Sequence, residues 1–395
     1  MFLRSERIFP NELFALIVGN LMDDRSSLRN LALVCKDFAQ MSQSILFRAI
    51  NLDGLSIWGH SYPAGLRYQH HLKSFLRTSS ILRFVQQLDV FPNKFFNAGD
   101  AARILGDMTS LTAFTLISPK LGHIHAIGSS LPSTLKILCI NRLDAADVGA
   151  FASTLLLLKS LEALAMTSIC VRLTEKLDIV FPRSLKTAFF RTVSSDLLQA
   201  IGSGLKSSPL PSLRSIVLDD IFSANSQVPA VLDCSRLWHG LGTDTQIVFV
   251  ERPFPEAAQA FRATKLIWMW RQYTELAKLL CVTHVSSLPP SVCELVIELD
   301  AGEISGQHLP LIPGHREDWS RLDDILVQRH RRGLLTLVCV RCTRRDGFFQ
   351  VLGPSLCSKG FDRSILEHIE ILLPKSKITG FLQVDRDMED FAPTM

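Results

Sequence analysis

Side chains that could carry out chemistry are scattered along this chain, without the partners that a reaction or a metal ion needs. Cys339 and Cys342 form a single C-x-x-C pair. Zinc would need a second such pair or suitably spaced histidines, so we interpret both cysteines as core residues. The histidines at 70 and 71, and those at 123 and 125, have no carboxylate close by in the sequence to orient a metal ligand or an acid–base group.

Motifs for covalent or phosphate chemistry are missing as well. The sequence has no glycine-rich phosphate loop with a following lysine and no nucleophile elbow. Cys35 falls on an apolar helix face, where burial disfavours the thiolate that a nucleophile requires. We therefore expect a chain that is not an enzyme and that uses neither a metal nor a cofactor. The alternative is a hydrolase or nucleotide-dependent enzyme within residues 226–395, which would require a polar pocket with strongly perturbed acids.

The charge of the chain favours neither nucleic acid nor a membrane as a partner. The 42 lysines and arginines nearly balance the 38 aspartates and glutamates, which leaves a net charge of +4. The densest basic run, residues 329–332, has no interleaved aromatic side chains for base stacking, so it predicts a solvated helix end. The sequence has neither a secretory signal nor a run of roughly eighteen apolar residues. With nine scattered cysteines, we expect a cytoplasmic or nuclear protein without disulfides.

The most informative stretch is residues 9–47, where three short amphipathic helices are predicted. Pro10 suits the first turn of a helix because its missing N–H would be unpaired there, and Glu12 favours the positive end of the helix dipole. Two apolar faces follow at helical spacing: Leu13, Leu16, Ile17 and Leu21 on one, and Phe14 and Val18 on the other. Two apolar faces need two covers, and we expect the second cover to be another protein.

A second helix is predicted after residues 22–27, where Asp24 or a serine can cap the first N–H groups. Its apolar side chains are predicted to be Leu28, Leu31, Ala32, Cys35 and Phe38, with Leu33 and Val34 facing elsewhere. A third helix is predicted around residues 41–47. Because three helices in about forty residues cannot bury a large core alone, the surplus apolar surface predicts a docking site.

The same stretch resembles an F-box, whose pattern runs Leu-Pro-x-Glu-Leu, an apolar helix, Leu-x-Leu-Val-Cys-Lys-x-Trp, and then Leu-Trp or Leu-Phe with a basic residue. The matching residues are Phe9, Pro10, Glu12, Leu13, Leu31, Leu33, Val34, Cys35, Lys36, Phe38, Leu46, Phe47 and Arg48. Phenylalanine replaces leucine at position 9 and tryptophan at positions 38 and 47, which keeps a large apolar side chain at each. The resemblance covers roughly the first fifty residues, and the presence of both halves at the right separation makes it specific.

The resemblance implies an adaptor that holds a Skp-type subunit and, through it, a cullin ubiquitin ligase. The chain would then be the substrate-recognition subunit of a Skp–cullin–F-box complex and would bind an unknown target protein through its later residues. The adaptor-binding residues implied are Phe9, Pro10, Leu13, Ile17, Leu21, Leu31, Val34, Cys35, Lys36, Phe38, Leu46 and Phe47. The alternatives are a helical cap on the domain that follows, and a scaffold that uses these helices outside a ubiquitin ligase.

A second pattern, a short apolar repeat of the form L-x-x-L-x-L, occupies the chain after the first eighty residues. It begins at residues 85, 111, 135, 161, 185 and 213, so its start advances by 26, 24, 26, 24 and 28 residues. This period is typical of leucine-rich repeats, in which each unit contributes a strand and a helical or irregular return. Prolines and polar residues before positions 135, 185 and 213 predict a turn that leads into each strand. Helices are predicted between the strands, at 97–108, 145–158 and 194–205.

After about residue 225 the repeat becomes less regular. Strands are predicted at 245–250, 292–299, 334–340 and 369–373, helices at 255–270 and 319–332, and a weakly ordered tail from residue 385. Two interpretations stay open for this part of the chain. It consists either of degenerate repeats that continue to a C-terminal cap or of a separate α/β domain.

The fold that we expect is α/β, with a small N-terminal three-helix F-box followed by an irregular leucine-rich-repeat solenoid of alternating strands and helices. The predicted divisions are 1–50 for the F-box, 51–80 for a linker or first cap, 81–225 for the solenoid, 226–384 for degenerate repeats or an α/β cap, and 385–395 for the tail. A target would contact outward side chains at the x positions of the strands, on the concave face. These are Thr112, Thr115, Lys136, Cys139, Glu162, Lys186, Arg214 and Val217.

Overall fold

The structure is a computed structural model, and it describes residues 11–51, 80–90, 98–117, 119, 123–143, 148–169, 177–219, 237, 241, 245–250, 265–270, 285, 288–300, 316–344 and 369–390. The chain forms two compact units, one of Met1–Asn141 with Ala146–Leu161 and one of Arg142–Ala145 with Glu162–Met395. The architecture of the described residues is α/β, because both units combine parallel strands with helices.

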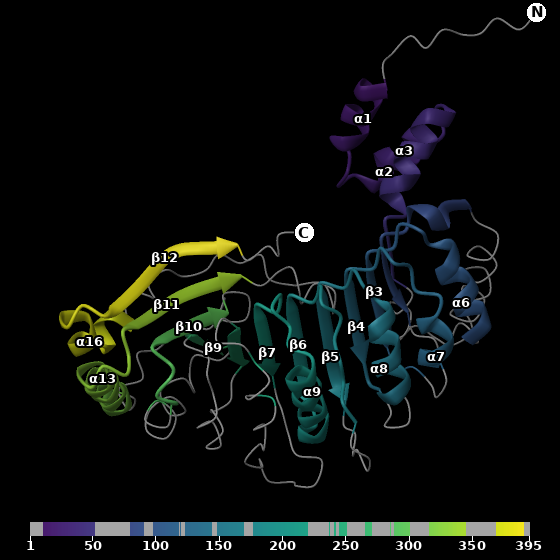
Figure 1. Cartoon of the computed structure of the whole chain (residues 1–395). Helices are drawn as coiled ribbons and strands as arrows, with labels where there is room; N and C mark the ends of the chain where they lie inside the picture. The colour runs from purple at the N-terminus through teal and green to yellow at the C-terminus, as the bar shows by residue number, and fades with distance from the viewer. Residues whose placement is uncertain are drawn as a thin grey trace, which may run out of the picture. The chain divides into compact units, whose positions relative to one another are not determined.

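The first unit begins with three helices and continues into parallel strands. Figure 1 shows the helices in purple, ahead of strands that lie side by side in chain order. Its elements are α1 (Asn11–Gly19), α2 (Arg25–Leu31), α3 (Lys36–Leu46), β1 (Ala49–Asn51), the 3₁₀-helix η1 (Ser80–Phe84), β2 (Gln87–Val90), α6 (Ala98–Asp107), β3 (Ala113–Ile117), α7 (His123–Gly128), β4 (Ile137–Asn141) and α8 (Val148–Leu157).

The second unit holds the remaining described strands, β5 to β12, and within it each strand from β6 onward pairs in parallel with the strand before it in the chain. Its elements are β5 (Ala163–Ile169), β6 (Thr187–Val193), α9 (Ser195–Ser207), β7 (Ser215–Asp219), β8 (Gln246–Val250), β9 (Lys265–Trp270), β10 (Glu294–Asp300), α13 (Arg316–Arg331), β11 (Leu337–Arg344), α16 (Pro374–Ile378) and β12 (Leu382–Asp390). The strands after residue 225 therefore pair in the same way as β5 to β7.

The apolar repeat found in the sequence forms the core of both units. All eighteen apolar positions of the six patterns are buried, and each pattern coincides with a strand from β2 to β7. The parallel register aligns equivalent positions, for example Phe114 with Leu138 in the first unit and Phe190 with Leu218 in the second. Equal periods along the chain therefore become rows of apolar side chains across neighbouring strands.

A turn leads into each strand, as the sequence predicts. The N–H of the first apolar residue of a pattern donates to the carbonyl three residues before it, as from Leu135 to Pro132 and from Leu185 to Pro182, both at 3.1 Å. The next N–H already bonds to the preceding repeat, for example from Lys186 to the Glu162 carbonyl at 2.8 Å. The ladder between repeats therefore begins one residue before the strand proper.

Three residues with left-handed backbone occupy the same place in successive repeats. Arg142, Ser168 and Thr192 have φ angles of 63°, 55° and 54°. Each lies seven residues after the start of its pattern, at 135, 161 and 185. Thr192 is β-branched, and such a residue rarely adopts this region, so the position in the repeat, and not the residue type, accounts for the backbone there.

Several predicted elements are wrong in type or extent. The predicted helix at 255–270 lies partly outside the described residues, but its last part is strand β9. The predicted strand at 369–373 is helical over 369–372. Of the predicted tail, residues 385–390 belong to β12, and the rest lies outside the described residues. Strand β1 and helix α7 are additional elements that the sequence reasoning missed.

The predicted target-binding positions divide into three groups by exposure. Lys136, Lys186 and Arg214, which immediately precede the strands, are exposed. Thr115, Cys139 and Val217, at the centres of their strands, are buried at 2%, 3% and 4% exposure, so the prediction that a target could contact them is wrong. The remaining two positions, Thr112 and Glu162, are half-buried.

Candidate protein-docking site

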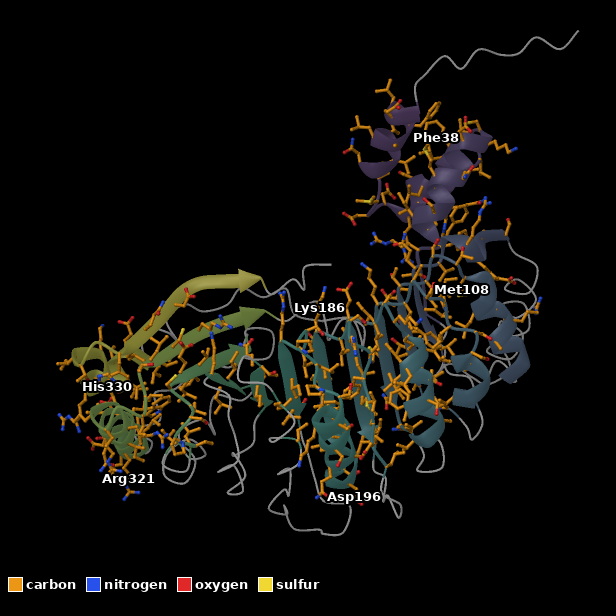
Figure 2. The ribbon with its side chains drawn as sticks, viewed as in Figure 1. Phe38, Met108, Lys186, Asp196, Arg321 and His330 are labelled. Carbon is orange, nitrogen blue, oxygen red and sulfur yellow. The ribbon has the colours of Figure 1, made fainter. Side chains whose placement is uncertain are left out.

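Helix α1 has an inner and an outer apolar face, which confirms the two faces predicted for it. On the inner face Val18 is only 2% exposed, and the ring of Phe14 packs edge-on against Phe38 of α3 with 4.5 Å between centroids. On the outer face Leu13, Leu16 and Ile17 are 45%, 64% and 46% exposed. Figure 2 shows Phe38 among the three N-terminal helices. The outer face is the part of α1 that a partner could cover.

Helix α2 is capped at its start by Asp24. Its carboxylate accepts hydrogen bonds from the N–H groups of Ser26 and Ser27, both at 3.0 Å, and from the Ser27 hydroxyl at 2.5 Å. The Ser27 hydroxyl, followed by the Ser27 N–H, holds the pKa of Asp24 below its usual value. This cap fixes the entry into α2, whose inner residue Leu28 is fully buried.

The turn between α2 and α3 corrects the predicted helix boundaries. Helix α2 ends at Leu31 instead of continuing to Phe38, and α3 begins at Lys36 instead of near residue 41. Cys35 between them has extended backbone, with φ −157° and ψ 169°, so the helix cannot continue through it. The interruption leaves Leu33 and Val34 in a turn, where they are 85% and 67% exposed.

Helix α3 packs against both of the other N-terminal helices. It contacts α1, α2 and η1, and its Ser42 is fully buried. Phe47 caps its C-terminal end and donates its N–H to the Gln43 carbonyl at 3.0 Å. Exposed apolar side chains occur on α1 and in the turn after α2, and both of these helices pack on α3.

Two of the predicted adaptor-binding residues lie outside the described residues, and the others are either exposed or half-buried. Phe9 and Pro10 lie outside the described residues. Leu13, Ile17, Val34, Cys35 and Lys36 are exposed. Leu21, Leu31, Phe38, Leu46 and Phe47 are half-buried, and Phe38 belongs to the packing between α1 and α3. The exposed members are available to a partner, whereas Phe38 already has a covering ring.

Leu16, Met22 and Leu33 are exposed apolar residues that the predicted set omits. Their exposed fractions are 64%, 55% and 85%. Leu16 could have been included because it lies three residues after Leu13 on the same helix face. Leu33 was assigned away from the helix core, and only the turn before Cys35 shows that it faces solvent. Together with Leu13, Ile17 and Val34 they make up what we call the N-terminal apolar surface.

Residues considered for chemistry form no reactive cluster in the described part of the chain. There, no group of three or more histidine, cysteine or acidic side chains could hold a metal ion. The basic run predicted as a solvated helix end is solvated only in part, because Arg331 and Arg332 are exposed but Arg329 is 7% exposed and donates to the Pro289 carbonyl at 3.2 Å. Burial lowers the pKa of Arg329, and the charge of Arg332 acts in the same direction.

Cys35 and Cys139 should differ sharply in reactivity. Cys35 is exposed, whereas Cys139 is buried on β4, where burial and then the charge of Asp89 raise the pKa of the thiol to about 12. We expect limited iodoacetamide at about pH 8 to modify Cys35 long before Cys139 in the folded chain. Peptide mass spectrometry reads both sites, and both should react in denaturant. Equal rates in the folded chain would contradict the burial of Cys139.

Two comparisons with known proteins returned no match. No protein-family model matches the sequence, and a search of curated proteins returns no significant match. Of the helices in the described residues, none combines the length and apolar character needed to cross a bilayer.

Proposed function

We propose that this chain is the substrate-recognition subunit of a Skp–cullin–F-box ubiquitin ligase. In this proposal residues 1–50 are an F-box that docks on a Skp-type adaptor, and the strand repeats bind a target protein. The chain itself supplies no catalytic group. It would accelerate ubiquitin transfer by holding the target near a conjugating enzyme carried elsewhere in the complex.

The observation that carries the proposal is the concentration of exposed apolar side chains at one end of the chain. In the described residues, six of the ten exposed large apolar side chains belong to the N-terminal apolar surface, between positions 13 and 34. A monomer that left them in water would forgo roughly 1.5–3 kcal/mol for each fully buried side chain. Their clustering supports a permanent partner, because isolated exposed leucines need no such explanation.

The sequence pattern supports the identity of that partner. Val34, Cys35 and Lys36 of the F-box-like pattern are exposed in or beside the α2–α3 turn, and Leu13 of its first half is exposed on α1. A stable interface of standard size buries about 800 Å² on each partner. A few apolar anchors usually dominate its binding energy.

The test is affinity purification of the tagged full-length chain from its own cell type, followed by mass spectrometry. We expect a Skp-type adaptor and a cullin to be recovered together with the chain. Recovery of neither by folded protein would overturn the proposal and favour a scaffold that works outside a ubiquitin ligase. Ubiquitin transfer to a co-purified protein, dependent on this chain, would then identify targets.

A further inference from the structure

A surface pocket lies between helices α13 and α16 of the second unit. It has a volume of about 440 Å³, which is within the range of pockets that hold small ligands or a few side chains of a peptide. Helix α13 contributes Asp324, Val327, Gln328 and Arg331, and α16 with the residue after it contributes Lys375, Ile378 and Thr379.

The walls of this pocket are held together by the buried carboxylate of Asp323. This side chain is on α13, is 1% exposed, and accepts hydrogen bonds from the N–H groups of Lys375 and Ser376 at 2.7 and 2.8 Å. The Ser376 hydroxyl donates to it as well, at 2.5 Å. Helix α16 is therefore fixed on α13 before any ligand binds, which lowers the entropic cost of binding.

The pocket combines a cation with an apolar wall. Lys375 is engaged by Asp324 at 2.5 Å, which leaves Arg331 as the lining cation with no ion pair among the described residues. Ile378, 86% exposed, is the most exposed of the large apolar side chains in the described residues, and it lines the same pocket. A ligand that carries a negative charge next to an aliphatic group would be complementary to both side chains.

Exposure of the lining argues for a peptide over a small molecule. Six of the seven lining residues are exposed, and only Val327 is buried. The site is thus an open groove, whereas small-molecule sites bury 70–90% or more of the ligand surface. An extended segment of another protein can lie across such a groove and use it for two adjacent side chains.

We propose that this groove binds a short acidic segment of a target protein. An aspartate or glutamate carboxylate pairs with the Arg331 guanidinium, in the two-pronged geometry that arginine favours, and a neighbouring leucine, isoleucine or valine packs on Ile378. As the place where a target is recognised, the groove deepens the proposed function and rests on it. As a peptide-binding site of the free chain it is independent of adaptor docking.

The experiment selects peptides on the full-length chain without the adaptor. A phage-displayed library of short random peptides should yield clones in which an acidic residue stands next to, or one position from, an aliphatic residue. Fluorescence anisotropy with the best synthetic peptide should show about tenfold weaker binding for Arg331→Glu and for Ile378→Asp. Added salt should weaken binding to the natural chain, because the pair is solvent-exposed.

Two control variants make the same chemical changes outside the groove. Arg321→Glu changes the same charge on the same helix, and Ile371→Asp changes a side chain that is 70% exposed, but neither residue lines the groove. Figure 2 labels Arg321 and His330 on α13. Both control variants should bind the peptide as the natural chain does, and all four should keep its thermal midpoint.

The results separate this proposal from the proposed function. Failure to enrich acidic–aliphatic peptides, or binding that Arg331→Glu and Ile378→Asp leave unchanged, would overturn the groove as a target site. Neither result bears on the adaptor, whose binding is measured on its own. If Arg331→Glu alone lowers the thermal midpoint, the Ile378→Asp result decides.

Discussion

The double substitution Leu13→Asp with Val34→Asp is expected to abolish binding of the proposed Skp-type adaptor, raising the dissociation constant by at least about a hundredfold. Each aspartate would place a carboxylate where the bound partner excludes water, and desolvating it without a counter-charge costs several kcal/mol. The fold should survive because Leu13 and Val34 are 45% and 67% exposed in the chain alone. Co-purification and calorimetry with the purified adaptor measure the effect.

A matched control lies in the same compact unit. Leu156 and Leu157 of α8 are 54% and 61% exposed, so Leu156→Asp with Leu157→Asp makes the same chemical change outside the N-terminal apolar surface. This control should bind the adaptor as tightly as the natural chain. Retained binding in the Leu13 and Val34 variant, with an unchanged circular dichroism melt, would mean that another surface contacts the adaptor.

The substitution Gly204→Ala is expected to destabilise the region of α9 by about 2–3 kcal/mol. A Cβ at this position would stand 1.9 Å from the Ile179 carbonyl oxygen and 2.4 Å from its carbon, both backbone atoms that cannot rotate away. The Ile179 N–H also donates to the Ala200 carbonyl on α9, so the segment at 177–180 is tied to the helix. Either the helix or residues 177–180 must move.

Hydrogen exchange read by mass spectrometry is the suitable measurement, because a repeat protein need not unfold in one step. Peptides that cover residues 177–207 should exchange faster in Gly204→Ala, while β2 to β4 keep their protection. Gly149→Ala is the control, because a Cβ there meets nothing within 4 Å and alanine favours a helix over glycine by about 1 kcal/mol. Equal protection of residues 177–207 in both variants would contradict the close contact at Gly204.

The regular part of the fold could be predicted from the sequence because its signal is repeated. A single L-x-x-L-x-L pattern is ambiguous, but six of them at periods of 24 to 28 residues require a common structure. The helices α6, α8 and α9 were found within a few residues of their bounds. Each of these lies between two strands that were already assigned.

The errors fall where local patterns are short. Residues 265–270, Lys-Leu-Ile-Trp-Met-Trp, are almost continuously apolar, so periodicity cannot separate helix from strand. Pairing with β8 and β10 makes this segment a strand. At 369–373 four of the five residues are apolar, and this short run was predicted to be a strand. Ile369 and Leu373 are both buried one helical turn apart, and Ile371 between them is 70% exposed.

The end of β12 shows why a tail was predicted where a strand exists. Residues 385–390 are dominated by charge, and nothing in them favours a sheet. The register sets Arg341 beside Asp385 and Arg344 beside Asp390. Opposite charges on neighbouring strands favour pairing, and they can be recognised only once β11 is known to be the neighbour.

The sequence located the candidate docking site but did not identify all of its exposed residues. The two faces of α1 follow from helical spacing alone, and Leu13 and Ile17 are on the exposed one. The exposure of Leu33 depends on the extended backbone at Cys35, which no periodic signal announces. Phe38 matches the F-box-like pattern, yet its contact with Phe14 places it inside the helical unit.

Within each unit, every described strand after the first pairs with the strand that precedes it in the chain. Among these strands, hydrogen bonding therefore joins neighbouring repeats and not distant ones. Gain or loss of one complete repeat would leave the remaining strand pairs in register. Deletion of a single strand residue would instead turn that strand's apolar side chains to the wrong face of the sheet. The length of such a chain is therefore free to change in steps of one repeat, by duplication or excision, without redesign of the core that remains.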